Sequence, residues 1–314
     1  MSFTFPSSTG IAIHHTPYPF ISPSKFTNKL TGKVILITGA SRGIGRATLA
    51  FASTGASLAL LSRTASTLSS LVQEITSLYP QTPTLSITAD VLSSSPFTII
   101  AEIEAKLGKV DILINNAGTY RMRPFLEEQT ASDIDQWWHI FEVNVKAPIA
   151  LMHACLPSFV EKKHGIVINV GSLVAAETSF PNVASYAASK AALLRVTELL
   201  DLELREKGVK SFYIHPGQVK TDMSLGRGAG EKGVVGSEMR EVTKGFEPLL
   251  NDEPELAAWS MVALAVLAGK DGDERVGVLS GRYWNVEEDL GELLERTREI
   301  EEGGGLYRLG IGRL

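Results

Sequence analysis

The feature that most limits how this chain can fold is an apolar run that leads directly into a glycine-rich turn. Val34 to Thr38 has the β-branched composition of a short buried strand, and Gly39, Gly43 and Gly45 follow at once. Residues 46–53 then show a helical pattern. A strand, a glycine turn and a helix in this order can present backbone N–H groups to a phosphate. The same glycines could also form a plain tight connection, so the turn alone leaves both interpretations open.

The alternation of strand and helix continues along most of the chain. Further strands are expected at residues 57–62, 84–89, 110–115, 165–170, 209–215 and 276–284, and helices at 68–78, 97–107, 134–162, 186–207 and 255–267. Pro148 falls inside the longest helical pattern and is expected to start or kink a segment there. This order predicts βαβ units with right-handed crossovers. We therefore predict an α/β protein with a Rossmann-like, doubly wound parallel sheet of about seven strands and helices on both faces.

One domain is expected, with an arm before it and a tail after it. Residues 1–30 contain four prolines and no acidic residue, which favours an extended arm. A transit peptide is the alternative, although such peptides are rich in arginine and this segment has none. The domain itself is expected at residues 31–286, and a charged helical tail at residues 287–314.

Composition narrows the class of protein. The net charge of −5 gives no support to a nucleic-acid surface, and no apolar run approaches the ~20 residues of a membrane span. The single cysteine, Cys155, excludes a disulfide within the chain and is expected to be a small core residue in a reducing compartment. We therefore expect a cytoplasmic protein that acts on a small molecule and binds neither nucleic acid nor membrane.

A candidate acid/base site comes from three polar residues. Tyr186 and Lys190 stand four residues apart in a helical segment, so their side chains share one face. A free tyrosine loses its proton near pH ~10, and a nearby ammonium is expected to lower that pKa. Ser172 follows an apolar run and could hydrogen-bond the same substrate oxygen. By itself the pair also fits a half-buried tyrosine beside a solvated lysine.

The chemically informative residues gather where the expected strands end. The glycine turn, Asp90, Asn115, Ser172 and Pro216 each stand at or just past the carboxyl end of a strand. In doubly wound sheets, ligands bind beyond these ends. This shared position favours a dinucleotide site with catalytic groups beside it.

The end of the second strand indicates which dinucleotide is bound. An acidic residue normally binds the ribose hydroxyls of NAD at this place, but the chain has Ser62 and Arg63 instead. Arg63 and Arg42 could both face a 2′-phosphate, which a guanidinium suits well. Two solvated surface arginines are the alternative. We predict NADP(H) rather than NAD(H).

With these motifs the chain resembles the short-chain dehydrogenases/reductases over residues 30–284, and its arm and the segment at 280–284 resemble fungal members. The resemblance implies that Asn144 joins Ser172, Tyr186 and Lys190 as a catalytic residue. It also implies a cofactor site made of Gly39, Ser41, Arg42, Gly43, Ile44, Gly45, Ser62, Arg63, Asp90, Val91, Asn116, Ala117, Gly118, Tyr186, Lys190, Pro216, Gly217, Val219 and Thr221.

The resemblance further implies hydride transfer between a nicotinamide and a carbonyl carbon. Tyr186 would transfer the proton, Ser172 would polarise the substrate, and Asn144 would position a water in the proton relay. No metal is expected to take part. A redox-silent or cyclase-like member of the same fold is the alternative. The family usually forms homodimers or homotetramers through the helices expected at 134–162 and 186–207.

The segment expected to set the substrate is glycine-rich. Residues 221–250 correspond to the family's mobile lid over the substrate. The candidate pocket residues are apolar and favour a bulky lipophilic substrate: Tyr120, Met122, Leu173, Met223, Leu225, Met239 and Phe246.

Overall fold

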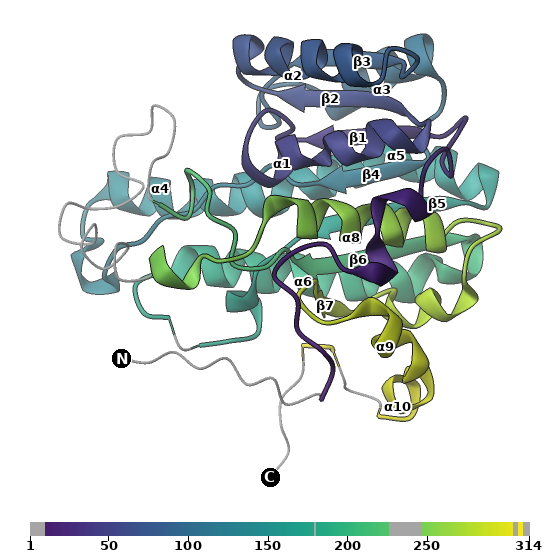
Figure 1. Cartoon of the computed structure of the whole chain (residues 1–314). Helices are drawn as coiled ribbons and strands as arrows, with labels where there is room; N and C mark the ends of the chain where they lie inside the picture. Colours follow the sequence, from purple (N-terminus) through teal and green to yellow (C-terminus); the bar gives the residue numbers. More distant parts are fainter. Residues whose placement is uncertain (1–9, 179, 226–246, 304–306, 310–314) are drawn as a thin grey trace.

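The protein is built on one parallel β-sheet, whose strands lie side by side from β3 to β7 in the computed structural model (Figure 1). The structure describes residues 10–178, 180–225, 247–303 and 307–309. The seven strands lie in the order β3-β2-β1-β4-β5-β6-β7, and every neighbouring pair is parallel. The strands are β1 Val34–Thr38, β2 Ser57–Ser62, β3 Thr84–Thr88, β4 Ile112–Asn115, β5 Gly165–Val170, β6 Val209–His215 and β7 Tyr283–Asn285.

The sheet order confirms the predicted doubly wound α/β architecture of a Rossmann-like fold. β1 and β4 are neighbours, so the winding reverses between them and leaves a crevice at their carboxyl ends. The central strands β1 and β5 are buried along their whole length, which explains their mostly apolar sequences. β3 lies at the sheet edge and is only partly buried, and its sequence alternates with polar residues accordingly.

Helices cover both faces of the sheet. α1, α2 and α8 share one apolar core with the sheet, and α3 and α5 share the other. The helices are α1 Gly43–Ala47, α2 Ala65–Leu78, α3 Pro96–Leu107, α4 Ala131–Phe141, α5 Ala147–Lys162, α6 Ala184–Leu204, α8 Pro254–Leu267, α9 Leu290–Glu295 and α10 Thr297–Glu302. Cys155 belongs to the second core, and burial raises the pKa of its thiol to about 12.

The long helical stretch 131–162 is interrupted rather than uniform. A π-helical turn, Glu142–Lys146, separates α4 from α5, and Pro148 stands in the first turn of α5, as the expectation of a segment start required. By length and composition this stretch could cross a membrane. No run of that length was expected from the sequence. In this fold, however, α5 packs against the sheet and α4 packs against α6.

Two expectations near the carboxyl terminus are wrong in detail. Residues 276–284 were expected to form one strand, but Glu274–Leu279 is a 3₁₀ segment and only Tyr283–Asn285 pairs with β6. The buried side chains of Val276 and Leu279 satisfy the apolar pattern without strand pairing. The tail expected to be helical from residue 287 contains two short helices, and Arg296 stands between α9 and α10.

The described part of the arm, residues 10–30, packs on the domain. Tyr18 and Ile21 are buried in the first core together with Leu290 and Leu293 of α9. The Leu290 backbone N–H donates to the Tyr18 hydroxyl at 2.8 Å. Figure 1 shows the arm running beside α9 and β7, so the two ends of the described chain lie next to each other.

Candidate active site

The glycine turn and the end of β4 are joined by one threonine. The Thr38 hydroxyl accepts from the backbone N–H groups of Asn116 and Ala117, both at 3.0 Å. The Asn116 side-chain amide donates back to the Thr38 carbonyl at 2.9 Å. The two loops on either side of the crevice are therefore held as a unit. Thr38 was included in the glycine motif but was not singled out as a site residue.

The glycines of the turn are required by close approaches. A Cβ on Gly45 would lie 2.0 Å from the Gly39 carbonyl oxygen, and one on Gly39 would lie 2.9 Å from Ala117 Cα. Gly39 and Gly43 also have positive φ, which side chains disfavour. Because the turn is this tight, α1 begins at Gly43, only a few residues past the carboxyl end of β1, and Ile44 stands in its first turn.

Ser172 and Tyr186 meet as predicted. Their side chains form a hydrogen bond that lowers the pKa of the tyrosine, but burial has the larger effect and the net pKa of Tyr186 is raised. The Lys190 Nζ lies 5.7 Å from the centre of the Tyr186 ring and does not reverse this shift. The expected lowering of the Tyr186 pKa by Lys190 is not seen in this structure: burial, the larger effect, raises that pKa, and the hydrogen bond with Ser172 is the effect that lowers it.

Lys190 is buried beneath the tyrosine. Its ammonium group donates to the Val170 carbonyl at 2.8 Å, and burial lowers its pKa to about 8. A Cβ on Gly118 would lie 3.7 Å from Lys190 Nζ and 3.4 Å from Asn144 Oδ1, so these three residues converge. A buried ammonium that donates to one carbonyl among the described residues is well placed to donate to a further hydroxyl group.

Asn144 is held at the π-helical turn. Its side chain is fully buried, accepts from the Thr119 backbone N–H at 2.9 Å and donates to the Thr119 carbonyl at 2.9 Å. It also donates to the Ser189 hydroxyl at 3.0 Å, one residue before Lys190. π-helical turns are frequent at functional sites, and this one directs the amide towards the lysine. Thr119 and Ser189 were not predicted.

The residues expected on the adenosine side lie at the ends of β1, β2 and β3. The hydroxyls of Ser41 and Ser62 are 2.7 Å apart, which ties the glycine turn to the end of β2. Arg42 and Arg63 flank this pair and are exposed. Past β3, the carboxylate of Asp90 accepts from the Leu92 backbone N–H at 2.9 Å, so its turn, with Val91 inside it, is preformed.

The segment after β6 reaches the glycine turn. A Cβ on Gly43 would lie 3.2 Å from the Thr221 methyl group, which places Thr221 against the turn. Pro216 and Val219 are buried, and Gly217 has a φ of +84°. The predicted site residues thus gather past the carboxyl ends of the strands.

An apolar cluster lies beside Tyr186. It contains Tyr120, Met122 and Met223 from the predicted pocket set, together with Val183 and Phe180. The rings of Tyr120 and Tyr186 meet edge to face, with centres 5.7 Å apart. Leu173 and Leu225 are half-buried outside this cluster. Met239, Phe246 and most of the expected lid, residues 226–246, lie outside the described residues.

Two unpredicted residues of β6 hold the Ser172 turn. The Ser172 backbone N–H donates to the Tyr213 hydroxyl at 2.9 Å, and the Leu173 backbone N–H donates to His215 Nδ1 at 3.2 Å. A Cβ on Gly171 would lie 1.9 Å from Tyr213 Cζ, so only glycine fits beside this ring. The one visible sequence signal was Gly171, but its partner is more than forty residues away.

Comparison with known proteins agrees with this geometry. The family model described as short chain dehydrogenase matches residues 33–232. A short chain dehydrogenase of Pseudocercospora fijiensis is 37% identical over 318 residues, which cover 100% of this chain and 97% of that protein. The short chain dehydrogenase citE of Monascus ruber is 34% identical over 312 residues, with 96% and 97% covered.

Solved structures give the same result. A metagenomic short-chain oxidoreductase in complex with NADP aligns with a TM-score of 0.61 and 27% identity, over 78% of this chain and 95% of that one. A putative short chain dehydrogenase from Pseudomonas syringae aligns with a TM-score of 0.67 and 28% identity, over 82% and 96%. The sheet order, the crevice and these relatives together lead to one conclusion: the chain belongs to the short chain dehydrogenase family and is an oxidoreductase of that family.

Proposed function

We propose that the protein is an NADP(H)-dependent oxidoreductase acting on the carbonyl group or secondary alcohol of a bulky lipophilic metabolite. The observation that carries the proposal is the hydrogen-bonded pair Ser172–Tyr186, with buried Lys190 beneath it, between the crevice and an apolar cluster. The dinucleotide, when bound, supplies or accepts the hydride.

The residues of the crevice fit such a cofactor. The glycine turn leaves backbone N–H groups at the start of α1 free of side-chain cover, as a pyrophosphate requires. Arg42 and Arg63 flank the end of β2, where no carboxylate would repel a 2′-phosphate. These two arginines support NADP(H) over NAD(H), and one aligned relative is in complex with NADP.

Side chains of the protein itself would transfer the proton to and from the substrate oxygen. The raised pKa keeps Tyr186 protonated at neutral pH, so it can donate to a carbonyl oxygen during reduction and must lose its proton for the reverse reaction. Ser172 shares that oxygen as a second donor. Lys190 would hold ribose hydroxyls, and Asn144 fixes the backbone of Thr119 beside it.

The cluster next to Tyr186 supports the substrate class. Tyr120, Met122, Val183 and Met223 present aromatic, thioether and aliphatic surface beside Tyr186. Such a lining favours an apolar molecule whose single polar group is the reacting oxygen. Methionine side chains adapt to irregular ligand shapes.

The test is oxidation of NADPH with a panel of bulky ketones, comparing the wild type with Tyr186→Phe. We expect turnover that falls by about 10³-fold in the variant, because its proton donor is lost. Tyr79→Phe, a half-buried tyrosine at the end of α2, is the matched control and should keep full activity. NADH should be the poorer cofactor. Tight NADPH binding with no turnover in either direction would favour the redox-silent or cyclase-like alternative.

A further inference from the structure

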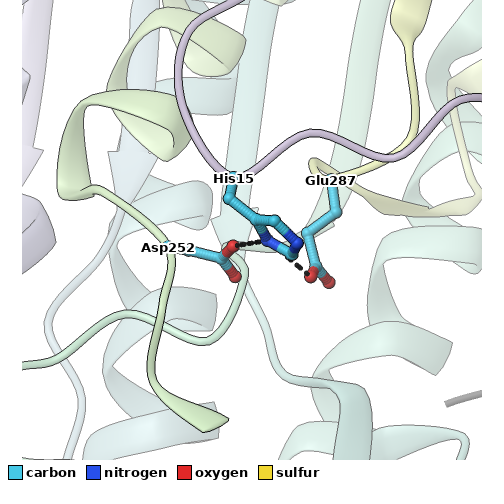
Figure 2. Close-up of side chains that lie close together, drawn as sticks. All are labelled: His15, Asp252 and Glu287. Atoms are coloured by element: carbon cyan, nitrogen blue, oxygen red, sulfur yellow. Dashed lines mark hydrogen bonds and ion pairs between the residues drawn. The ribbon is translucent and has the colours of Figure 1, made fainter. Parts of the chain in front are cut away.

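Three ionisable side chains from distant parts of the chain meet outside the candidate active site (Figure 2). His15 comes from the arm, Asp252 precedes α8 and Glu287 follows β7. His15 Nδ1 lies 2.5 Å from Asp252 Oδ1 and 3.8 Å from Glu287 Oε1. One atom from each of the three side chains lies within 4.8 Å of the others. Zn²⁺–N and Zn²⁺–O bonds of about 2.0–2.2 Å allow two ligand atoms of one ion to lie up to about 4.4 Å apart, and both distances from His15 Nδ1 fall within that limit.

The main chain holds the cluster in place. The His14 backbone N–H donates to the Glu287 carbonyl at 2.7 Å, and the Glu253 backbone N–H donates to the His15 carbonyl at 2.9 Å. The two carboxylates therefore do not depend on their side chains alone to stay beside His15. A site fixed in this way needs little reorganisation to accept a ligand.

The cluster lacks positive charge. The side chain of Asp252 is fully buried and that of Glu287 is 15% exposed. Among the described residues, the only ion-pair partners of either carboxylate are histidines, and no lysine or arginine reaches them. His15 is 46% exposed, so one side of the cluster is open to solvent and an ion could enter there. Two adjacent carboxylates in such surroundings call for a cation.

His215 provides an independent observation. Its side chain is 5% exposed, its Nδ1 accepts from the Leu173 backbone N–H, and its Nε2 makes no hydrogen bond to any described residue. In the neutral ring Nε2 therefore carries the proton, and it lies 4.0 Å from Glu287 Oε2. A buried N–H group aimed into the cluster needs an acceptor there. A water bound to an ion would supply one.

We propose that His15, Asp252 and Glu287 form a binding site for one divalent transition-metal ion, Zn²⁺ in the first instance, through Nδ1 and one oxygen of each carboxylate. A single imidazole with two carboxylates favours Zn²⁺ over Mg²⁺, which prefers all-oxygen sites. The ion takes the place of the hydrogen bond between His15 Nδ1 and Asp252, and the neutral His15 ring then carries its proton on Nε2. His215 lies outside the ligand set and donates to a water on the ion.

A bound ion would connect three segments that are far apart in the sequence. Asp252 also accepts from the Gln218 backbone N–H through its other oxygen, and Gln218 lies between Gly217 and Val219 of the predicted cofactor segment. The ion would thus hold the arm, the segment after β7 and this loop together. The proposal does not depend on the enzymatic activity, since its readouts are binding and stability.

The experiment is calorimetric titration of the chelator-treated full-length protein with ZnCl₂, repeated with MgCl₂. We expect one saturable Zn²⁺ site per chain, and an affinity reduced by ~10–100-fold in both Glu287→Gln and His15→Gln. His14→Gln is the matched control, because this neighbouring histidine pairs with Asp289 outside the cluster. It should bind Zn²⁺ as the wild type does.

Thermal unfolding provides the second readout. Zn²⁺ should raise the melting temperature of the wild type and of His14→Gln, but not that of Glu287→Gln, because only a folded site binds the ion. Glu287→Gln is isosteric and His15 is half-exposed, so folded variants are expected without metal. The proposal would be overturned if all four proteins bound Zn²⁺ equally, or if the wild type showed no saturable binding. His15 and Asp252 would then be joined by a hydrogen bond alone.

Discussion

At Tyr186 two effects act on one proton in opposite directions. Burial favours the neutral phenol, and the hydrogen bond with Ser172 favours the phenolate. A sequence reveals the spacing of Tyr186 and Lys190 but not how deeply each is buried. The direction of the tyrosine's pKa shift was therefore predicted wrongly, although the structure brings Ser172 and Tyr186 together.

Ser172→Ala tests this balance. Removing the hydroxyl removes the effect that lowers the pKa of Tyr186, so that pKa should rise further. For ketone reduction, in which the tyrosine acts as an acid, kcat should fall by ~10–100-fold, and the loss of activity at alkaline pH should move to higher pH. The pH profile of kcat/KM measures this shift. A downward move would contradict the assigned hydrogen bond.

Among the elements, α6 shows where a sequence pattern misleads. Its leucines at 193, 194, 199 and 202 read as one apolar pattern, yet the first two are buried and Leu202 is 77% exposed. The buried positions near its end are Glu198 and Asp201. Arg195 and Arg205 pair with them, and Leu309 N–H donates to Glu198 at 2.7 Å. Periodicity does not show which face other segments cover.

We propose that the exposed leucines of α6 lie in the interface of the expected homo-oligomer. Leu199 and Leu202 lie one turn apart, and α4 next to α6 exposes Trp138. Leu202→Glu should therefore shift the protein to monomers, measured as molar mass by light scattering. The same change at Leu78, an exposed leucine on α2, is the control and should leave the mass unchanged. A monomeric wild type would rule out this use of α6.

At the scale of the whole molecule, local sequence patterns predicted the architecture. They did not predict the contacts that join distant segments. Strands β1, β5 and β6 were predicted from apolar runs bounded by turns, and the parallel sheet followed from their alternation with helices. The hydrogen bond between Ser172 and Tyr213 joins residues 41 positions apart, and the His15–Asp252 contact joins residues 237 positions apart. No local pattern predicts such pairs, because each depends on the completed fold.

Stability of the whole chain should fall in mild acid. Burial lowers the pKa of His164 to about 4, so between pH ~4 and ~6.5 the unfolded chain binds the proton and the folded chain does not. By linkage, this residue should remove roughly 2 kcal/mol of unfolding free energy from pH 7 to pH 5. Urea unfolding at both values should show a smaller loss in His164→Gln. Equal losses would exclude His164 as the cause.

The packing of the arm against α9 also has a consequence for how the protein is made. His14 and Asp289 are 275 residues apart and hydrogen-bonded at 2.9 Å. At ~5–20 residues per second, a ribosome needs roughly 14–55 s to add the second after the first. The arm thus waits for partners that are translated 275 residues later. During that interval Tyr18 and Ile21 lack the α9 surface that covers them in the folded protein. Their apolar side chains are then accessible to factors that bind nascent chains.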